Sequence, residues 1–267
     1  MSVQTLYTAA TGMDALQTKL DVIAHNLANI NTTGFKKNRA NFEDLFYRTE
    51  ALPGAQDSAG NRTATGTSIG LGTRVSSIQT DFLQGTILKT GNPLDVAIVG
   101  SGFFQVTDPN GQILFTRAGN FSRNLNGDLV LGSASVGRLL EPTINIPNEA
   151  IRYEIKPNGE VVFFTSTSPQ AQVAGQIQLA VFTNPEGLIK LGDNLYQQSD
   201  ASGTPTTDNP GNTGFGELRG GFLEASNVDP VNELIDLITT QRSFELNSEA
   251  VKTGDEILQL ISNLRRP

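Results

Sequence analysis

The sequence predicts a mixed α+β fold in which a discontinuous terminal α-helical domain, of coiled-coil character, accompanies an antiparallel β body. Three observations predict it. Apolar residues from 6 to 30 are spaced alternately three and four apart, a second helical pattern starts at Asp229, and short apolar runs separated by turn sequences fill the chain between them. Because the two helical patterns lie at opposite ends of the chain, we expect the termini to return to one place.

The first helix is predicted from a heptad seam, the pattern of a helix that lies along another helix. The other faces are polar, as at Gln4, Asp14 and Lys19. The seam consists of Leu6, Ala9, Met13, Leu16, Leu20, Ile23, Leu27 and Ile30. One helix cannot bury this seam alone, so the sequence predicts a partner helix.

The first helix is expected to end near Ile30, because turn-forming residues crowd the chain there. These residues are Asn26, Asn29, Asn31 and Gly34, the last suited to a left-handed conformation. The pattern is typical of a helix C-terminus and turn; the alternative is a polar cluster that fixes the register between packed subunits. The basic run Lys36, Lys37 and Arg39 is expected on a solvated face near the helix end, where cations are favoured.

Residues 46–74 are predicted to be an extended linker or arm. From Leu52 to Thr73 the chain has no periodicity and is rich in Gly, Ser and Thr. Such a length is unusual for a loop inside a compact domain. The segment is therefore expected either to be mobile or to dock on another molecule.

Residues 75–225 are predicted to form the antiparallel β body, with about ten short strands. The expected strands are 75–78, 94–99, 103–106, 113–116, 129–131, 151–155, 161–164 and 177–182. Turn sequences lie between them at 108–111, 126–127, 157–159 and 185–187. A second polar segment rich in Gly and Pro, 199–216, precedes a last β-like run at 217–225.

The second helix is predicted to begin at Asp229 and Pro230, an N-cap residue followed by proline at the first helical position. Its seam is predicted to consist of Leu234, Leu237, Phe244, Val251 and Leu258, and a second apolar set begins with Val231, Ile235 and Ile238. Residues 226–267 and 1–45 together are assigned to a terminal helical polymerisation domain. Either the helices close a monomer as a hairpin, or they also pack against other copies of the chain.

Composition and charge narrow the functional classes. The net charge of −8 argues against a nucleic-acid partner, and no stretch is long and apolar enough for membrane insertion. The chain has no cysteine, which excludes disulfides and thiolate metal sites. The N-terminus lacks the basic and apolar regions of a Sec signal peptide, so export is expected to use another route.

No catalytic, cofactor-binding or metal-binding arrangement is found in the sequence. His25 is the only histidine and is expected to be polar filler at a helix interface. Phosphate-binding and nucleophile motifs are missing, and Asp95, flanked by apolar residues, has no visible partner acid. The sequence therefore predicts a protein that is not an enzyme and needs no cofactor or metal.

Several segments resemble the signatures of the flagellar rod and hook family of axial proteins. Residues 23–36, IAHNLANINTTGFK, resemble its N-terminal signature through Asn26, Leu27, Ala28, Asn29, Asn31, Thr32, Gly34 and Phe35. Residues 95–106 and 116–121 are similar to its central β motifs, and residues 221–228 with 238–245 look like its C-terminal signature. His25 is a departure, because the family usually has Asn at that position.

Within the family, the short β body and the segment after Phe42, including Pro53 to Gln56, resemble the distal-rod type of subunit. The resemblance implies a structural subunit that polymerises helically into a hollow drive shaft, which transmits motor torque to the hook and passes exported subunits. The alternatives are a proximal-rod or hook subunit and, in another class, a periplasmic carbohydrate-binding or hydrolytic β protein. A chain with no Trp and only 4 Tyr argues against sugar stacking.

The resemblance also implies the partners and the location. The partners would be other copies of the chain, proximal rod proteins, the hook protein, the P-ring and L-ring proteins and the flagellar type III export apparatus. The location would be the flagellar basal body, where the shaft spans the periplasm after export without a cleaved signal. Neither nucleic-acid binding nor membrane insertion is expected.

Overall fold

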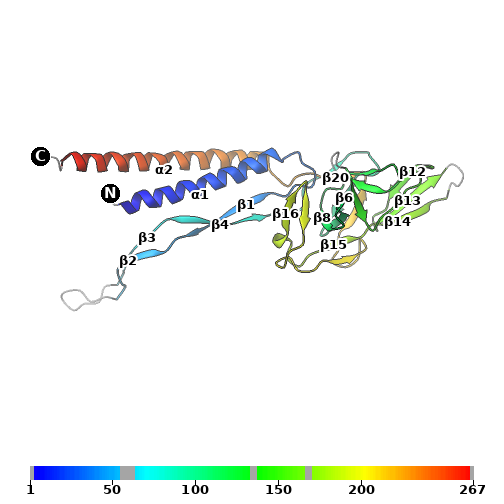
Figure 1. The fold of residues 1–267 in the computed structure, drawn as a ribbon, viewed down its shortest axis with the longest axis horizontal. Helices are drawn as coiled ribbons and strands as arrows, with labels where there is room; N and C mark the ends of the chain where they lie inside the picture. The colour runs from blue at the N-terminus through cyan, green and yellow to red at the C-terminus, as the bar shows by residue number, and fades with distance from the viewer. Residues whose placement is uncertain (1–2, 55–63, 133–136, 166–169, 265–267) are drawn as a thin grey trace. The chain divides into compact units, whose positions relative to one another are not determined.

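The computed structural model describes residues 3–54, 64–132, 137–165 and 170–264. They belong to two compact units, each assembled from separate stretches of the chain. Unit 1 comprises residues 1–27, 38–79 and 229–267, and unit 2 comprises residues 28–37 and 80–228. The α+β class and the antiparallel β body are confirmed (Figure 1), whereas coiled-coil winding of the helices stays a prediction.

Unit 1 contains two antiparallel helices that lie side by side, α1 (Val3–Ala28) and α2 (Pro230–Leu264) (Figure 1). Their backbones approach closely at two small residues. A Cβ added at Gly254 of α2 would lie 2.5 Å from Leu6 Cδ2, and one added at Gly12 of α1 would lie 3.3 Å from Asn247 Nδ2. The predicted partner helix of α1 is therefore α2 of the same chain.

The start of α2 has the predicted cap. Asp229 Oδ1 accepts a hydrogen bond from the Val231 N–H at 3.0 Å, and Asp229 Oδ2 accepts one from Asn232 Nδ2 at 2.7 Å. These bonds satisfy a donor that the first turn of a helix leaves free. Among the described residues, neither helix is both long and apolar enough to cross a membrane.

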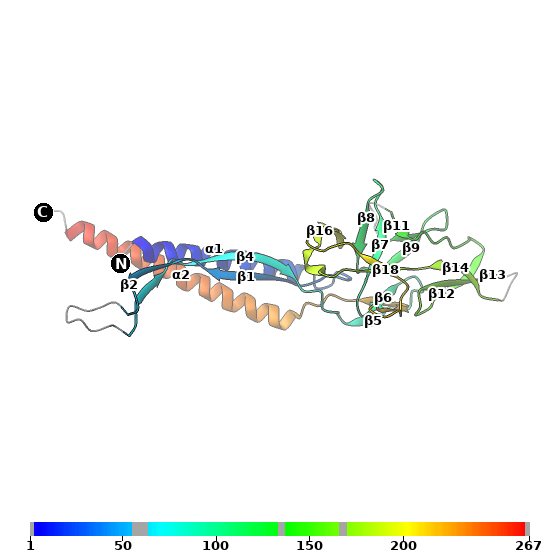
Figure 2. The same cartoon turned by 90° about the horizontal axis from the view of Figure 1, so that it is seen from below.

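The rest of unit 1 is β structure, of which the sequence predicted only residues 75–78, inside β4 (Thr73–Thr80). Strand β1 (Asn38–Asp44) pairs with β4, and β2 (Tyr47–Ala51) pairs antiparallel with β3 (Thr67–Gly70) (Figure 2). Residues 38–44, assigned to the helical domain, are thus a strand, and the predicted arm begins and ends in paired strands. All residues of β2 are exposed, so no alternation of buried and exposed residues marks it. Residues 55–63 of the arm lie outside the described residues.

Unit 2 is built from short, mostly antiparallel strands. Its largest sheet has nine strands, in the order β16-β17-β8-β7-β11-β10-β9, with β15 pairing both β7 and β18. A three-stranded sheet β12-β13-β14 and the pairs β19-β6 and β20-β5 complete it. The bounds are β5 Ile87–Lys89, β6 Val96–Val99, β7 Phe103–Thr107, β8 Ile113–Thr116, β9 Phe121–Arg123, β10 Leu129–Leu131, β11 Arg138–Glu141, β12 Ala150–Ile155, β13 Glu160–Thr165, β14 Gln172–Gln176, β15 Leu179–Val181, β16 Ile189–Gly192, β17 Leu195–Gln197, β18 Thr206–Asp208, β19 Glu217–Gly220 and β20 Phe222–Glu224.

Three of the predicted turns join neighbouring antiparallel strands. Gly111, Gly127 and Gly159 have φ values of 80°, 93° and 89°, the left-handed region that glycine adopts without steric cost. They connect β7 to β8, β9 to β10 and β12 to β13. The fourth, Pro185–Gly187, is a 3₁₀ turn between β15 and β16, which do not pair with each other.

Two apolar clusters hold unit 2 together. The larger one joins residues of most sheets, such as Val96, Phe104, Leu129, Leu140 and Val161, all of them fully buried. The smaller one is aromatic: Phe103, Phe115, Phe182 and Tyr196 pack edge to face, with Phe82 against them. This packing gives the short strands a common core.

Candidate functional site

The predicted seam of α1 faces inward. Ile23 is buried, and Leu6, Ala9, Met13, Leu16, Leu20, Leu27 and Ile30 are half-buried. Ala15 and Val22 are also buried, although the heptad pattern omits them. No predicted seam residue of α1 is exposed, so within one chain this face is already largely covered.

The face of α2 toward α1 combines a polar or small row, which the sequence did not predict, with four of the five predicted seam residues. Glu233, Thr240, Asn247 and Gly254 recur every seven residues; Glu233 and Thr240 are only 1% and 2% exposed. The predicted residues Leu237, Phe244, Val251 and Leu258 flank them and are half-buried. The predicted Leu234 does not belong to this face, since it is 46% exposed.

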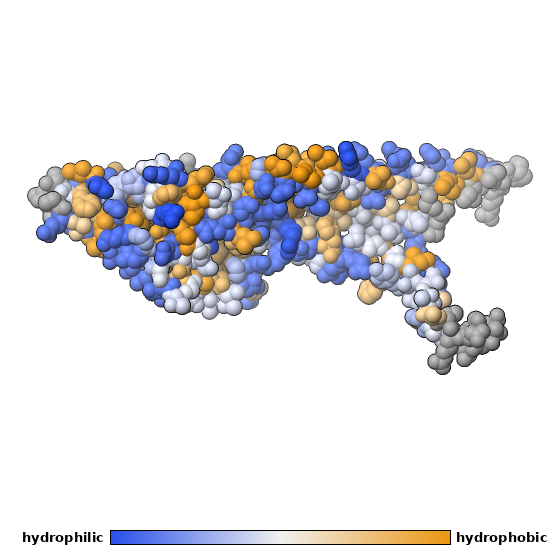
Figure 3. Space-filling view, turned by 180° about the vertical axis from the view of Figure 1, so that it is seen from behind, coloured by the Kyte–Doolittle hydropathy of each residue, from blue (hydrophilic) through white to orange (hydrophobic). Residues whose placement is uncertain are grey.

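The outer face of α2 begins with an aliphatic stripe. It consists of Val231, Leu234, Ile235 and Ile238, which are 62%, 46%, 54% and 50% exposed. With about 3.6 residues per turn, these positions lie on one side of the helix, opposite the polar heptad that contacts α1. Figure 3 shows hydrophobic side chains gathered over the start of α2. The stripe is therefore an apolar surface that the described part of the chain leaves uncovered.

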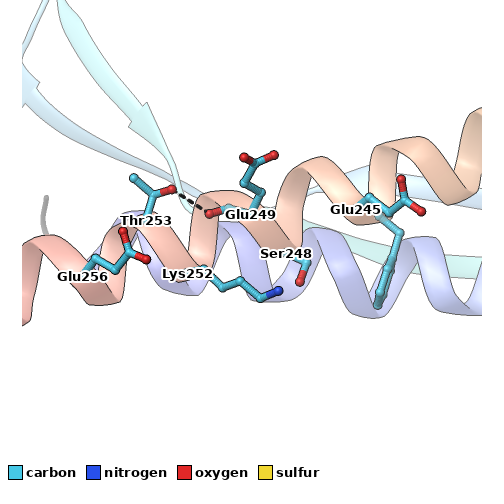
Figure 4. Close-up of a pocket in the computed structure, with 7 residues that line it drawn as sticks. Glu245, Ser248, Glu249, Lys252, Thr253 and Glu256 are labelled. Atoms are coloured by element: carbon cyan, nitrogen blue, oxygen red, sulfur yellow. Dashed lines mark hydrogen bonds between the residues drawn. The ribbon is translucent and has the colours of Figure 1, made fainter.

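Further along, the outer face of α2 becomes charged. A shallow groove there is lined by Phe244, Glu245, Ser248, Glu249, Lys252, Thr253 and Glu256 (Figure 4). The only hydrogen bond drawn among them is internal to the helix, from Thr253 Oγ1 to the Glu249 carbonyl at 2.9 Å. Within the described residues, no group of His, Cys, Asp or Glu side chains has the arrangement of a metal site. The groove has no arrangement that supports chemistry.

Asn26 of the N-terminal signature is 1% exposed and fixes the register of three segments of unit 1. Its Oδ1 accepts a hydrogen bond from the Asn38 N–H at 2.9 Å, and its Nδ2 donates to the Asn38 carbonyl at 2.9 Å. Nδ2 also lies 3.3 Å from Glu233 Oε2 of α2. The amide of Asn26 thus acts within one chain, whereas a role of the polar cluster Asn26, Asn29 and Asn31 in the register between subunits stays a prediction.

The rest of the signature forms the turn that follows α1. Thr32 Oγ1 donates to Asn29 Oδ1 at 3.1 Å, and Gly34 has a φ of 69°. A Cβ at Gly34 would lie 2.8 Å from the Ala118 backbone nitrogen, so close backbone approach also requires glycine there. Phe35 is buried, Leu27 is half-buried, and Ala28, Asn31 and His25 are exposed.

Of the basic run after the turn, Lys36 is buried, contrary to the predicted solvated face, whereas Lys37 is half-buried and Arg39 is exposed. The side chains of Lys36 and Glu224 are both fully buried, with Lys36 Nζ 2.6 Å from Glu224 Oε1. Arg117 Nη1 lies 3.5 Å from Glu224 Oε2. Burial lowers the pKa of Lys36, and Arg117 adds to this, while Glu224 opposes it. Glu224 neutralises a buried cation that no local pattern connects to it.

Comparison with known proteins identifies relatives over the whole chain. Three family models match: "Flagella basal body rod protein" at residues 6–36, "Flagellar hook protein FlgE/F/G D1 domain" at 97–163 and "Flagellar basal body rod FlgEFG protein C-terminal" at 219–264. The chain is 45% identical over 264 residues to the flagellar basal-body rod protein FlgG of Caulobacter vibrioides, covering 98% of this chain and 100% of that protein.

Two further relatives compare the chain with a second rod protein and with a hook protein. FlgG of Agrobacterium fabrum is 43% identical over 261 residues, covering 97% of this chain and 98% of that protein. The flagellar hook protein FlgE of Salmonella typhimurium is 26% identical over 417 aligned residues, covering 96% of this chain and 99% of that protein. The longer alignment means that the hook protein contains residues that this chain lacks.

Proposed function

Because this chain belongs to the flagellar rod and hook protein family, we propose that it is a structural subunit of the flagellar basal-body distal rod. In this role it polymerises helically into a hollow drive shaft, which transmits motor torque to the hook and passes exported subunits. Its work is mechanical and the chain is not an enzyme. The basal body is accordingly its location.

The relatives favour the distal rod over the alternatives. Rod proteins match this chain end to end at 43% and 45% identity, whereas the hook protein matches at 26% and is longer. A hook or proximal-rod subunit and a carbohydrate-binding or hydrolytic β protein are therefore not favoured. The assignment of residues 1–45 and 226–267 to polymerisation, 46–74 to an arm and 75–225 to the β body belongs to this proposal.

The aliphatic stripe of α2 carries the proposal for how the subunits associate. Four neighbouring aliphatic side chains, each about half exposed or more, form a face that α1 does not cover. In a family that self-assembles, this face supports packing against another copy of the chain. The predicted interface residues Leu6 to Ile30 are buried or half-buried within one chain, so their part in the polymerisation interface stays a prediction, and the stripe carries the proposal.

Further partners follow from the proposed place in the basal body. Proximal rod proteins and the hook protein would contact the two ends of the shaft. The P-ring and L-ring proteins would surround it where it spans the periplasm, and the flagellar type III apparatus would export the subunit. The net charge of −8 supports the absence of nucleic acid among these partners.

The substitution Ile235→Asp tests the stripe. A carboxylate buried in an apolar helix interface has no compensating partner, so we expect assembly to be lost while the helix content stays unchanged. Ala250→Asp is the matched control, because it adds the same charge to an exposed position on another side of α2. Electron microscopy and sedimentation measure assembly, and circular dichroism measures helix content. Tubes formed by Ile235→Asp as readily as by the parent would rule out the stripe; a parent chain that forms no tubes would rule out the function.

A further inference from the structure

The chain passes between the two units four times, after residues 27, 37, 79 and 228. Each passage leads into or out of one of three segments of unit 2, namely residues 28–37, the stretch that begins at residue 80, and the stretch that ends at residue 228. Any force transmitted through the covalent chain from one unit to the other must pass through these segments. How they are joined inside unit 2 therefore decides whether they move together.

Asn227 joins all three segments through one amide side chain. Its Oδ1 accepts a hydrogen bond from the Lys37 N–H at 2.7 Å. Its Nδ2 donates to the carbonyls of Asp81 at 2.9 Å and Leu83 at 3.1 Å. The Asp81 N–H in turn donates to the Lys37 carbonyl at 2.8 Å. One side chain thus uses its acceptor and both amide donors across three separate parts of the sequence.

A second layer of contacts lies beside Asn227 and joins the same segments. Lys36 Nζ donates to the Leu83 carbonyl at 2.7 Å and to Glu224 Oε1 at 2.6 Å. Glu224 Oε1 also accepts from the Gly85 N–H at 2.9 Å, and its carbonyl accepts from the Gly34 N–H at 2.8 Å. A Cβ at Gly85 would lie 2.1 Å from the Ala225 carbonyl oxygen, so the segments run in direct backbone contact.

We propose that Lys36, Glu224 and Asn227, here called the clasp, hold the four chain passages together so that they open, shift and bear load as one. The proposal rests on the proposed function, because load sharing matters in a shaft that transmits torque. Without the clasp, backbone contacts alone would join the segments, such as the bond from the Asp81 N–H to the Lys37 carbonyl and the pairing of β5 with β20, and a twisting force would load the passages less evenly. With it, hydrogen bonds in two layers oppose any sliding of one passage past the others.

Hydrogen exchange on the full-length chain tests the clasp directly. In Asn227→Ala we expect exchange to rise together, by about tenfold or more, at the amides of Gly34, Lys37, Asp81 and Gly85, the scale set by losing one buried hydrogen bond. Amides of the unit 2 core, such as that of Leu129, should keep their protection. A rise at Lys37 alone, whose N–H loses its acceptor directly, would overturn the proposal.

Asn124→Ala is the matched control for this experiment. Asn124 also uses its amide fully, since Oδ1 accepts from the N–H groups of Asn126 and Asp128 and Nδ2 donates to Asp128. All these contacts lie within one hairpin. Loss of the Asn124 amide should therefore leave hydrogen exchange at the clasp amides unchanged. If Asn227→Ala does not fold, Asn227→Asp keeps the acceptor for Lys37, removes the two donors and places a carboxylate against the Asp81 and Leu83 carbonyls. Concerted exchange in that variant supports the clasp, and parental protection overturns it.

Assembled tubes then test the mechanical consequence. Asn227→Ala tubes should form but bend more, with a persistence length several-fold below that of parent and Asn124→Ala tubes in electron micrographs. Variant tubes as stiff as the parent would overturn load sharing. A parent that forms no tubes would contradict the proposed function, and the exchange result would still decide whether the clasp opens as one.

Discussion

At the scale of single residues, the buried ion pair between Lys36 and Glu224 is the feature with the largest expected effect. A buried charge is tolerated only when it is paired and hydrogen-bonded, and Glu224 serves Lys36, Arg117 and the Gly85 N–H together. Both residues have apolar neighbours in sequence, Phe35 beside Lys36 and Leu223 beside Glu224, but no local pattern connects the two charges. Their separation of 188 residues explains why sequence patterns predicted a solvated lysine instead.

Glu224→Ala should destabilise unit 2 by about 3–5 kcal/mol, because it leaves two buried cations without their carboxylate. The double substitution Lys36→Met with Glu224→Gln should lower the free energy of unfolding clearly less than Glu224→Ala does. It removes both charges of the buried pair rather than leaving one of them unpaired. Urea unfolding followed by tyrosine fluorescence measures both. Equal losses in the two variants would contradict the electrostatic explanation.

Tyr196 predicts how stability responds to alkaline pH. Burial raises the pKa of Tyr196 to about 12 from the model-compound value of 10.0. As the pH rises, the unfolded chain therefore loses the Tyr196 proton first. The contribution of Tyr196 to the free energy of unfolding is intact below pH 10 and is lost as the pH rises toward 12. The melting temperature of Tyr196→Phe should fall less over this interval than that of the parent. Parallel curves for the two proteins would show that Tyr196 ionises freely in the fold.

At the scale of elements, the helix pair is held by a face of α2 that is poorly suited to tight pairing. Polar residues in a helix seam specify register at a cost in stability. Thr240 illustrates this, because its hydroxyl is buried and finds no hydrogen-bond partner among the described residues. The pairing of α1 with α2 is thus specific rather than strong.

Thr240→Val should therefore stabilise the helix pair by about 1 kcal/mol, since it removes a buried hydroxyl while keeping the shape of the side chain. The measurement is the thermal loss of helix signal by circular dichroism. Thr239→Val, at an exposed neighbouring position, is the control and should have little effect. A destabilised Thr240→Val would indicate that the hydroxyl is satisfied in solution.

The elements that sequence predicted share one property: their pattern is visible locally. Helices α1 and α2, and strands such as β7 and β8, show apolar periodicity or a neighbouring turn. The missed strands, such as β2 and β18, are short and exposed, and only a distant partner strand makes them β structure. Among the candidate site residues, Asn26 was recognised from its signature, but its role depends on Asn38 and Glu233, which no local pattern connects to it.

At the scale of the whole molecule, the arm at 46–74 is the part that the chain needs least for its own stability. Two-stranded ribbons are marginal alone in water, and β2 and β3 are almost entirely exposed. We propose that the arm lies across neighbouring subunits and restrains their sliding; its residues 55–63 lie outside the described residues. The two ends of the arm, however, form the paired strands β2 and β3.

Deleting Pro53 to Gly66 should leave the unfolding free energy of unit 2 unchanged and give tubes that curve. The free energy of folding depends only weakly on the length of a loop, so the deletion should cost the monomer little. Contacts that restrain bending would be lost on all sides of the shaft. Curvature is measured on electron micrographs of assembled tubes. Straight deletion tubes, as stiff as the parent, would return the arm to the status of a surface loop.

Because unit 1 is assembled from both ends of the chain, the pairing of α1 with α2 is delayed during synthesis. Asn26 and Glu233 are 207 residues apart, so α1 has no α2 to pair with until nearly the whole protein has left the ribosome. At translation rates of about 5–20 residues per second, this delay is roughly ten to forty seconds. During that interval the apolar side of α1 is available to a chaperone, and the nascent chain cannot yet present the α2 stripe to another subunit. The order of the two helices in the chain thus delays the appearance of the stripe until synthesis is nearly complete.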